Sequence, residues 1–287
     1  MITVKERGRR MNIGVIVPLD NYEHEFEQLN GFGISNCQFN AWNDSSFLTE
    51  ELAVKVREKA KECGITITGV WRGWSGPKAW NFTEGPTTLG LVPKEYREQR
   101  IADLKVGSDF AAVLGVEKVI THMGFLPEFP GDPEYPAIVE AIREVALYCK
   151  ERGQYLLFET GQETPVTLLR TIEAVGTGNL GINLDPANLI LYGKANPVDA
   201  LDVFGKYVME VHGKDGLYPT TGTYLGEEVR IGDGKVCFER LIPRLRECGF
   251  DGTITIEREI VGEEQIKDIK YAKAFLEALI EGAASAS

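Results

Sequence analysis

One pattern repeats eight times along this chain: a short apolar run is followed by a longer stretch with the apolar spacing of a helix. Strands that alternate with helices pair in parallel through crossover connections. Eight such units within about 270 residues are the number in a (β/α)8 barrel, so we predict a single α/β domain of the TIM-barrel type. The predicted strands are residues 12–18, 36–41, 65–71, 118–123, 155–159, 180–185, 207–212 and 252–257.

An open, doubly wound sheet is the alternative architecture for the same alternation. Such a sheet usually carries a glycine-rich turn after its first strand, whereas this chain has Val17-Pro18-Leu19-Asp20 there. No linker rich in Pro, Gly and Ser divides the chain. We therefore expect one barrel domain over residues 11–281, a disordered N-terminal extension over 1–10 and a flexible tail over 282–287.

Two connections are too long to be simple turns and are rich in aromatic residues. Residues 72–94 contain Trp74 and Trp80, and residues 213–235 contain two tyrosines. Loops of this length in a compact domain usually cover or line a binding site. We expect the first of them to be an aromatic cover on flexible glycine joints.

Composition and charge exclude several classes of partner. The 287 residues include 31 Lys and Arg against 43 Asp and Glu, a net charge of −12, which disfavours general binding to nucleic acid or anionic membranes. No apolar run reaches the ~18–20 residues of a membrane span, and no secretory signal is recognisable. The five cysteines are scattered and form no Cys-x-x-Cys pair, so we expect a reducing, cytoplasmic location without disulfides or structural zinc. The expected partner is a small molecule, and assembly as a homo-oligomer is compatible with the sequence.

Acidic residues and a histidine stand at the ends of four successive predicted strands. In chain order they are Glu159, Asp185, His212 and Glu257. The C-terminal strand ends of a barrel converge on one mouth, where such enzymes keep their active sites. Three carboxylates held together there would repel one another unless a cation were bound. We expect one divalent cation, Mn²⁺ first, with Mg²⁺, Co²⁺ or Fe²⁺ as alternatives, because oxygen ligands with one nitrogen suit these ions.

Each of these residues also has a structural interpretation. A single strand-end Glu is more often a helix cap or part of a surface ion pair, and Asp185 before Pro186 would itself be a good helix cap. A lone His212 is more often a hydrogen-bonded wall residue than a ligand. The metal interpretation is favoured because all four residues lie at the same end of consecutive strands.

Several motifs around these positions form an ordered set. They are Phe158-Glu159-Thr160, Asn183-Leu184-Asp185-Pro186-Ala187-Asn188, His212-Gly213-Lys214-Asp215-Gly216, Gly232-Asp233-Gly234 and Thr255-Ile256-Glu257. Over residues 11–281 the chain resembles the sugar isomerase/epimerase superfamily of xylose-isomerase-like TIM barrels, which includes ketose 3-epimerases and inosose dehydratases. The resemblance implies that the four strand-end residues hold one divalent metal ion. It also implies that Glu159 and Glu257 face the substrate from opposite sides as a proton donor and acceptor pair.

The chemistry of such a site allows more than one reaction. A metal ion on a substrate carbonyl stabilises the enediolate that forms when one Glu removes the neighbouring proton. Return of a proton to the other face gives epimerisation, return to the neighbouring carbon gives isomerisation, and loss of a leaving group gives elimination. We expect an isomerase or epimerase acting on a ketose, keto-sugar or sugar derivative. A dehydratase or keto-glycoside lyase is the alternative.

Further candidates would bind the substrate. They are His122, Asn188, Lys214, Trp71, Trp74, Trp80 and Arg230. Tryptophan rings suit the C–H faces of sugars, and His122 lies at the C-terminal end of the fourth predicted strand. The ketose 3-epimerases of the superfamily have His where this chain has Asn188, and an Arg a few residues after the metal-binding His where this chain has Lys214-Asp215-Gly216. These departures concern the substrate and leave the metal site intact.

Two other functions use a similar barrel. Apurinic endonucleases need several metal ions, many histidines and a basic face for DNA, whereas this chain has 3 histidines and a net charge of −12. A non-catalytic sugar-binding barrel would not need both Glu159 and Glu257. Both alternatives are therefore disfavoured.

Overall fold

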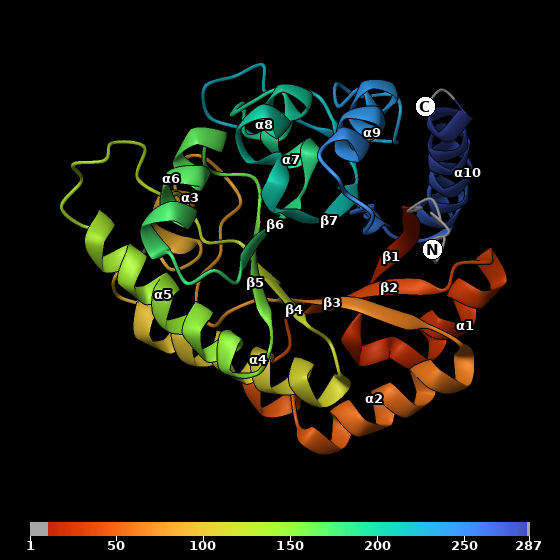
Figure 1. Ribbon diagram of the computed structural model, residues 1–287, viewed down its shortest axis with the longest axis horizontal. Coiled ribbons are helices and arrows are strands. Elements are labelled where there is room, and N and C mark those ends of the chain that lie inside the picture. Colours follow the sequence, from red (N-terminus) through yellow and green to blue (C-terminus); the bar gives the residue numbers. More distant parts are fainter. Residues whose placement is uncertain (1–10, 286–287) are drawn as a thin grey trace, which may run out of the picture.

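The computed structural model describes residues 11–285, and eight parallel strands close into a barrel surrounded by helices (Figure 1). The barrel strands are β1 (Asn12–Pro18), β2 (Asn36–Ala41), β3 (Thr66–Arg72), β4 (Lys118–Thr121), β5 (Tyr155–Glu159), β6 (Leu180–Leu184), β7 (Val208–Gly213) and β10 (Thr253–Ile256). They follow one another around the barrel in the order β1-β10-β7-β6-β5-β4-β3-β2. This closure confirms the predicted (β/α)8 barrel.

Helices connect the strands on the outside. The α-helices are α1 (Tyr22–Phe32), α2 (Glu50–Cys63), α3 (Gly85–Thr88), α4 (Arg97–Leu114), α5 (Tyr135–Glu151), α6 (Pro165–Val175), α7 (Pro186–Leu191), α8 (Pro197–Phe204), α9 (Phe238–Glu247) and α10 (Glu263–Ser285). Helices α1, α2, α4 and α5 pack side by side around one half of the barrel (Figure 1). No helix within residues 11–285 is both long and apolar enough to cross a bilayer.

Smaller elements lie at the strand ends. They are the 3-10 helices η1 (Leu19–Asn21), η2 (Ser45–Phe47) and η3 (Gly205–Tyr207), and a two-stranded ribbon of β8 (Asp215–Gly216) and β9 (Glu228–Val229). The predicted N-terminal extension, residues 1–10, lies outside the described residues. Helix α10 continues through residues 282–285, which the sequence had placed in the predicted tail.

Helix α2 illustrates how local sequence sets these elements. The Thr49 hydroxyl accepts a hydrogen bond from the backbone N–H of Leu52 and caps the helix. Ala53, Val56 and Ala60 recur at helical spacing and are buried against the barrel. The helix ends at Gly64, whose φ of 67° is a conformation that glycine adopts without strain. The amphipathic spacing therefore both forms the helix and directs it onto the sheet.

The long connection between β3 and α4 is fixed to α4. Arg100 Nη1 donates to the carbonyl of Gly90 (2.7 Å) and Nη2 to that of Pro77 (2.9 Å). Asp103 Oδ2 accepts from the backbone N–H of Ser75 at 2.8 Å. The sequence predicted a cover on flexible joints, but side chains of α4 hold the backbone of this loop at several points.

One glycine brings this loop next to the barrel mouth. Gly90 has a φ of +67°, and a Cβ on it would lie 2.0 Å from the carbonyl oxygen of Met123. The following residue, Leu91, donates its backbone N–H to that same oxygen at 2.9 Å. Only a residue without a side chain permits this approach. The loop is thereby docked beside His122, the residue before Met123.

Candidate active site

Four potential ligands meet at the C-terminal mouth of the barrel. Glu159 ends β5 and His212 lies near the end of β7. Asp185 directly follows β6, and Glu257 directly follows β10. These four strands are neighbours in the barrel, and one ligand atom from each residue lies within 4.8 Å of all the others. The structure therefore brings together the four ligands that the sequence predicted.

The ring of His212 presents one nitrogen to the carboxylates and the other to the barrel interior. Nδ1 lies 3.0 Å from Glu257 Oε2, 3.4 Å from Glu159 Oε1 and 3.6 Å from Asp185 Oδ2. Nε2 lies 2.8 Å from Gln38 Oε1, inside the barrel. A metal ion at Nδ1 requires that nitrogen to be unprotonated, so Nε2 then carries the proton and donates it to Gln38. Gln38 is the acceptor in this tautomer, and the side-chain nitrogen of Asn183 lies 3.1 Å from the same Nε2.

The two carboxylate oxygens of Asp185 have different roles: one caps a helix and the other belongs to the group of potential ligands. Oδ1 accepts a hydrogen bond from the backbone N–H of Asn188 at 2.8 Å and so caps α7. Oδ2 faces the other potential ligands. The side-chain amide of Asn188 in turn donates to Glu159 Oε1 at 3.4 Å. Both sequence interpretations of Asp185, as a helix cap and as a ligand, thus apply to the same residue.

The donor set fits one divalent cation. Glu159 Oε2, Asp185 Oδ2 and His212 Nδ1 are buried and form no hydrogen bond among the described residues. Buried polar atoms of this kind are costly to leave unpaired, and closely spaced carboxylates repel one another. A cation held by these three residues and Glu257 would satisfy the atoms and offset the negative charge. Three carboxylates and one imidazole suit Mn²⁺, Mg²⁺, Co²⁺ or Fe²⁺.

Electrostatic coupling inside the group is strong. Burial raises the pKa of Glu159 to about 7, although His212 opposes that rise. Burial would also raise the pKa of Glu257, but the charges of Lys214 and His212 hold it well below its ordinary value. Burial would lower the pKa of His212, but Glu257 and Glu159 raise it well above its ordinary value. Protein cations therefore offset the carboxylates of the group.

Lys214 is part of this charge balance. Its Nζ lies 2.7 Å from Glu259 Oε1, 3.3 Å from Glu257 Oε2 and 3.5 Å from Asp185 Oδ2. Burial would lower its pKa, but these carboxylates hold the pKa well above its ordinary value. The sequence suggested direct contact between Lys214 and substrate, yet Lys214 is buried and does not line the cavity described next. Its contacts make it a neutralising residue beside the ligands.

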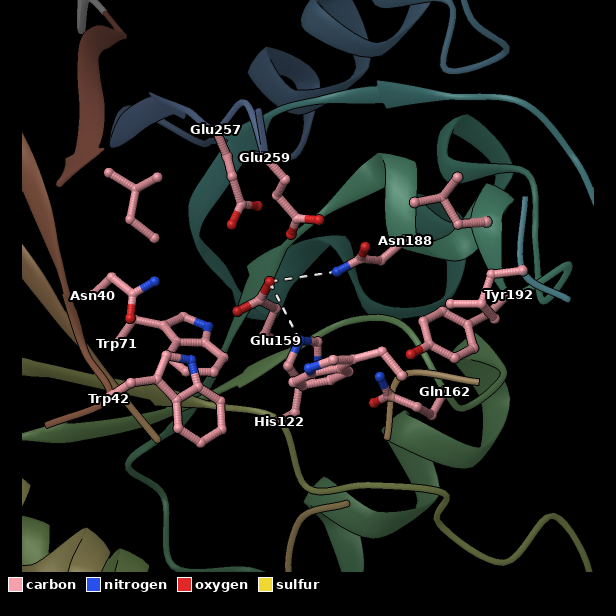
Figure 2. A pocket seen from close by; sticks show the side chains of 14 residues that line it. Asn40, Trp42, Trp71, His122, Glu159, Gln162, Asn188, Tyr192, Glu257 and Glu259 are labelled. Atoms are coloured by element: carbon pink, nitrogen blue, oxygen red, sulfur yellow. Dashed lines mark hydrogen bonds and ion pairs between the residues drawn. The ribbon is translucent and has the colours of Figure 1, made fainter. Parts of the chain in front are cut away.

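A cavity of about 290 Å³ opens beside the four candidate ligands. Figure 2 shows two of them, Glu159 and Glu257, in its lining. Its lining residues are Ile16, Asn40, Trp42, Trp71, Trp80, His122, Glu159, Gln162, Asn188, Leu191, Tyr192, Leu225, Glu257 and Glu259. Four of the predicted substrate-binding residues are among them: Trp71, Trp80, His122 and Asn188. The structure therefore provides a binding space whose floor includes both candidate acid/base carboxylates.

His122 contributes a neutral ring to this cavity. Its Nε2 lies 3.5 Å from Glu159 Oε1, and its ring centroid lies 5.7 Å from that of Trp71 and 5.1 Å from that of Trp80. Burial and the charge of Lys214 lower its pKa to about 3. The ring is then uncharged at neutral pH, and its Nδ1 has no hydrogen-bond partner among the described residues.

Two predicted substrate-binding residues lie elsewhere. Trp74 is only 5% exposed and packs edge-on against Trp42, with ring centroids 5.1 Å apart, so it supports the cavity wall from behind. Arg230 is exposed, pairs with Asp233 at 3.1 Å and lies over the ring of Tyr271. Neither lines the cavity. The fold of the two long loops, which sequence spacing does not reveal, decides both placements.

Other cavity residues were missed by sequence reasoning. They are Ile16, Asn40, Trp42, Gln162, Leu191, Tyr192, Leu225 and Glu259. Trp42 directly follows β2 and Gln162 follows Glu159 by three residues, so the strand-end argument could have found both. Tyr192 follows α7, and no local signal distinguishes it from a core residue.

The Gly232-Asp233-Gly234 motif has a structural explanation. The carboxylate of Asp215 accepts hydrogen bonds from the backbone N–H groups of four residues: Gly216 (2.9 Å), Gly232 (2.9 Å), Gly234 (3.1 Å) and Val236 (3.1 Å). A Cβ on Gly234 would lie 2.0 Å from Asp215 Oδ1. Asp215 thus fixes the loop after β7, and the glycines allow its backbone to approach the carboxylate closely.

Solved structures share this fold. A xylose isomerase domain protein from Planctomyces limnophilus is 34% identical, with a TM-score of 0.88 over 96% of this chain and 99% of that one. The 3-keto-D-glucoside 4-epimerase YcjR from E. coli is 16% identical, with a TM-score of 0.68 over 94% of this chain and 100% of that one. The probable 3-DHS dehydratase AsbF from Bacillus anthracis is 17% identical, with a TM-score of 0.68 over 92% and 99%. The last two likenesses concern the fold alone.

Sequence comparisons also point to a barrel family. A curated, uncharacterised protein from Methanocaldococcus jannaschii is 26% identical over 179 residues, and the matched region spans 58% of this chain and only 59% of that protein. Residues 27–279 match the family described as Xylose isomerase-like TIM barrel. This match, together with the 34% identity to the Planctomyces limnophilus protein, shows that the chain belongs to the xylose isomerase-like TIM barrel family.

Proposed function

We propose that this protein is a divalent-metal-dependent sugar isomerase or epimerase that acts on a ketose, keto-sugar or sugar derivative. The observation that carries the proposal is the placement of Glu159 and Glu257. Both belong to the four-ligand group and both line the cavity, from strands on either side of β6 and β7. A substrate in this cavity would meet two carboxylates from different directions, which is the arrangement that proton transfer to and from one carbon requires.

The residues divide the chemical tasks. Glu159, Asp185, His212 and Glu257 would hold the cation, which when bound supplies Lewis-acid stabilisation of negative charge on a substrate carbonyl oxygen. One of the two glutamates removes the proton beside the carbonyl, and the other returns a proton. His122 and Asn188 lie in the cavity wall and orient the substrate through hydrogen bonds. The apolar rings around them limit the access of water to the reacting carbon.

A lyase is the second candidate, because the same proton abstraction leads to elimination when a leaving group sits beside the carbanion. The similarity in fold to the probable dehydratase AsbF supports keeping this alternative. An apurinic endonuclease is disfavoured, because the ligand group contains one histidine only.

We also propose that the protein works in a reducing, cytoplasmic location. All five cysteines are free thiols, which supports this proposal.

Deuterium exchange tests the proposal. The protein loaded with Mn²⁺ or Mg²⁺ is incubated in D2O with a panel of ketoses and keto-sugars, and the products are followed by NMR. We expect deuterium at the carbon beside the carbonyl, with a new epimer or isomer. Release of water or an aglycone would identify the lyase instead. A metal-loaded protein that exchanges no proton of any sugar in the panel would contradict an enzymatic function at this site.

A further inference from the structure

The cavity offers neutral hydrogen-bonding groups and aromatic faces, but none of the described residues that line it has a basic side chain. None of the described residues that line it is Lys or Arg, whereas Glu159, Glu257 and Glu259 contribute carboxylates. Phosphate and carboxylate groups are usually bound by Arg or Lys side chains that pair with them. Glu159 and Glu257 would hold the cation, so an anionic substituent away from that cation would face Glu259 and have no Lys or Arg partner among the described lining residues.

The cations near the cavity already have other contacts. Lys214 is held by three carboxylates. Arg72 Nη1 donates to the backbone carbonyls of Ala41 (2.8 Å) and Asn43 (2.9 Å), and Arg100 is bound to loop carbonyls in the same manner. The Lys78 ammonium lies 3.8 Å from the centre of a tryptophan ring and is not part of the lining. Their contacts are therefore with the protein and not with the cavity.

Three neutral polar side chains of the lining lack partners. Gln162 Nε2 and Oε1, the Tyr192 hydroxyl and His122 Nδ1 form no hydrogen bond of good geometry among the described residues, although Gln162 lies close enough to the Tyr192 hydroxyl to offset part of the rise in its pKa on burial. These residues are 1%, 5% and 4% exposed, respectively. Buried polar groups are rarely unpaired because each lost hydrogen bond costs free energy. Groups that stay unpaired in a cavity wall are therefore suited to a bound ligand.

The unpartnered groups of the lining can both donate and accept hydrogen bonds, which suits the hydroxyl groups of a substrate. A hydroxyl both donates and accepts hydrogen bonds, as an amide side chain does, whereas a phosphate at neutral pH mainly accepts. Figure 2 shows Gln162 and Tyr192 on the side of the cavity opposite Trp42 and Trp71. One wall can thus bond to hydroxyls while the other presents rings to the C–H face of a sugar.

We infer that the cavity takes an uncharged, polyhydroxylated substrate, a free or glycosylated keto-sugar and not a phosphorylated or carboxylated one. Gln162 and Tyr192 are the specificity residues that bond to its hydroxyls, and Trp42 and Trp71 stack on its C–H face. This inference rests on the proposed function, since it concerns the same cavity.

The first experiment compares charged and uncharged substrates. Metal-loaded protein in D2O is given D-fructose, D-tagatose and 3-keto-glucosides, and in parallel their phosphate esters and sugar carboxylates. We expect the best uncharged sugar to exchange at least about tenfold faster than any anionic one at equal concentration. Equal or faster exchange of an anionic sugar overturns this inference and leaves the proposed function standing. Exchange of no sugar overturns the proposed function itself.

The second experiment uses two matched tyrosines. Tyr192→Phe removes an unpartnered hydroxyl, whereas the control Tyr135→Phe removes a buried hydroxyl that lies 3.3 Å from Thr171 Oγ1. We expect Tyr192→Phe to raise the KM for the best uncharged sugar about tenfold without lowering the melting temperature. The control should lower the melting temperature and leave KM unchanged. If Tyr192→Phe instead lowers the melting temperature and leaves KM unchanged, the hydroxyl serves the fold and the inference is wrong.

Discussion

The two sides of the cavity are built in different ways. The proposed metal-ligand group, called the metal-ligand group below, consists of Glu159, Asp185, His212 and Glu257, each at or next to the end of a barrel strand. The tryptophan cluster consists of Trp42, Trp71, Trp74 and Trp80, whose rings contact one another with centroids 5.0–6.5 Å apart. The strands alone position the first side. On the second side, Trp71 lies in β3 and Trp42 directly follows β2, whereas the positions of Trp74 and Trp80 depend on how the long loop after β3 packs.

Barrel topology fixes the positions of the ligand side chains, whereas the packing of the loop fixes the positions of Trp74 and Trp80. The closure of the barrel makes the ends of β5, β6, β7 and β10 converge, so a ligand's position along the chain determines its place in the site. In the tryptophan cluster, Trp74 and Trp80 lie six residues apart on one loop, yet one is buried behind the wall and the other is 39% exposed in the lining. Variants on the two sides should therefore have effects of different size and kind.

The largest effect is expected from the metal-ligand group. Asp185→Asn keeps a residue that caps α7 well but removes a charged oxygen, and His212→Ala removes the only nitrogen ligand. Both variants should lose metal and activity while the barrel stays folded, because the ligands lie at the mouth. Metal content by atomic emission and folding by circular dichroism check this. The exposed His24→Ala serves as the control. Normal metal content in both variants would refute the ligand assignment.

The next effect concerns proton transfer. Glu159→Gln and Glu257→Gln keep the shape of the side chain and one possible ligand oxygen but remove the proton acceptor. Activity should fall by about 10²–10⁴-fold, the usual contribution of a general acid or base. The measurement is turnover at saturating metal, with bound metal determined in the same sample. A loaded Gln variant with near-normal turnover would show that its carboxylate is a ligand only.

The sequence predicted the positions of those residues that lie at strand ends. The four ligands and His122 follow from the alternation of strands and helices, since the barrel mouth collects the ends of the strands. The burial of Trp74, the outward position of Arg230 and the role of Tyr192 do not follow from spacing. Each depends on long-range packing of a loop or on the residue after a short helix. Gln38 also escaped prediction, because a mid-strand Gln gives no sign that its partner is the ring of a candidate metal ligand.

Substitution of Gln38 should weaken metal binding, with an effect smaller than the loss of a ligand. Its Oε1 lies 2.8 Å from His212 Nε2, and both residues are fully buried. Gln38→Leu removes the acceptor, so the affinity for Mn²⁺ should fall about 10–100-fold, the usual cost of losing the partner of a ligating histidine. Gln38→Glu keeps an acceptor and should retain most of the affinity. Isothermal titration with Mn²⁺ measures both, and an unchanged dissociation constant in Gln38→Leu would refute the role of Gln38.

The smallest effect on catalysis, and the sharpest contrast within one loop, is expected from Trp80 and Trp74. Trp80 lines the cavity, and stacking on a sugar is worth about 1 kcal/mol, so Trp80→Ala should raise KM about fivefold. Its kcat should change little, because stacking stabilises ground and transition states alike. Since the ring is 39% exposed, its loss should disturb stability only modestly.

Trp74→Ala should show the opposite pattern. Its ring is 5% exposed, packs against Trp42 and lies 5.3 Å from the guanidinium of Arg100, so truncation leaves a cavity in the loop's support. The free energy of unfolding should fall by about 3–5 kcal/mol, as for other buried aromatic truncations. KM should rise less than in Trp80→Ala. Urea denaturation and steady-state kinetics on both variants test the contrast. Equal KM changes with equal stability losses would show that the loop acts as one unit, and the distinction between lining and supporting rings would be wrong.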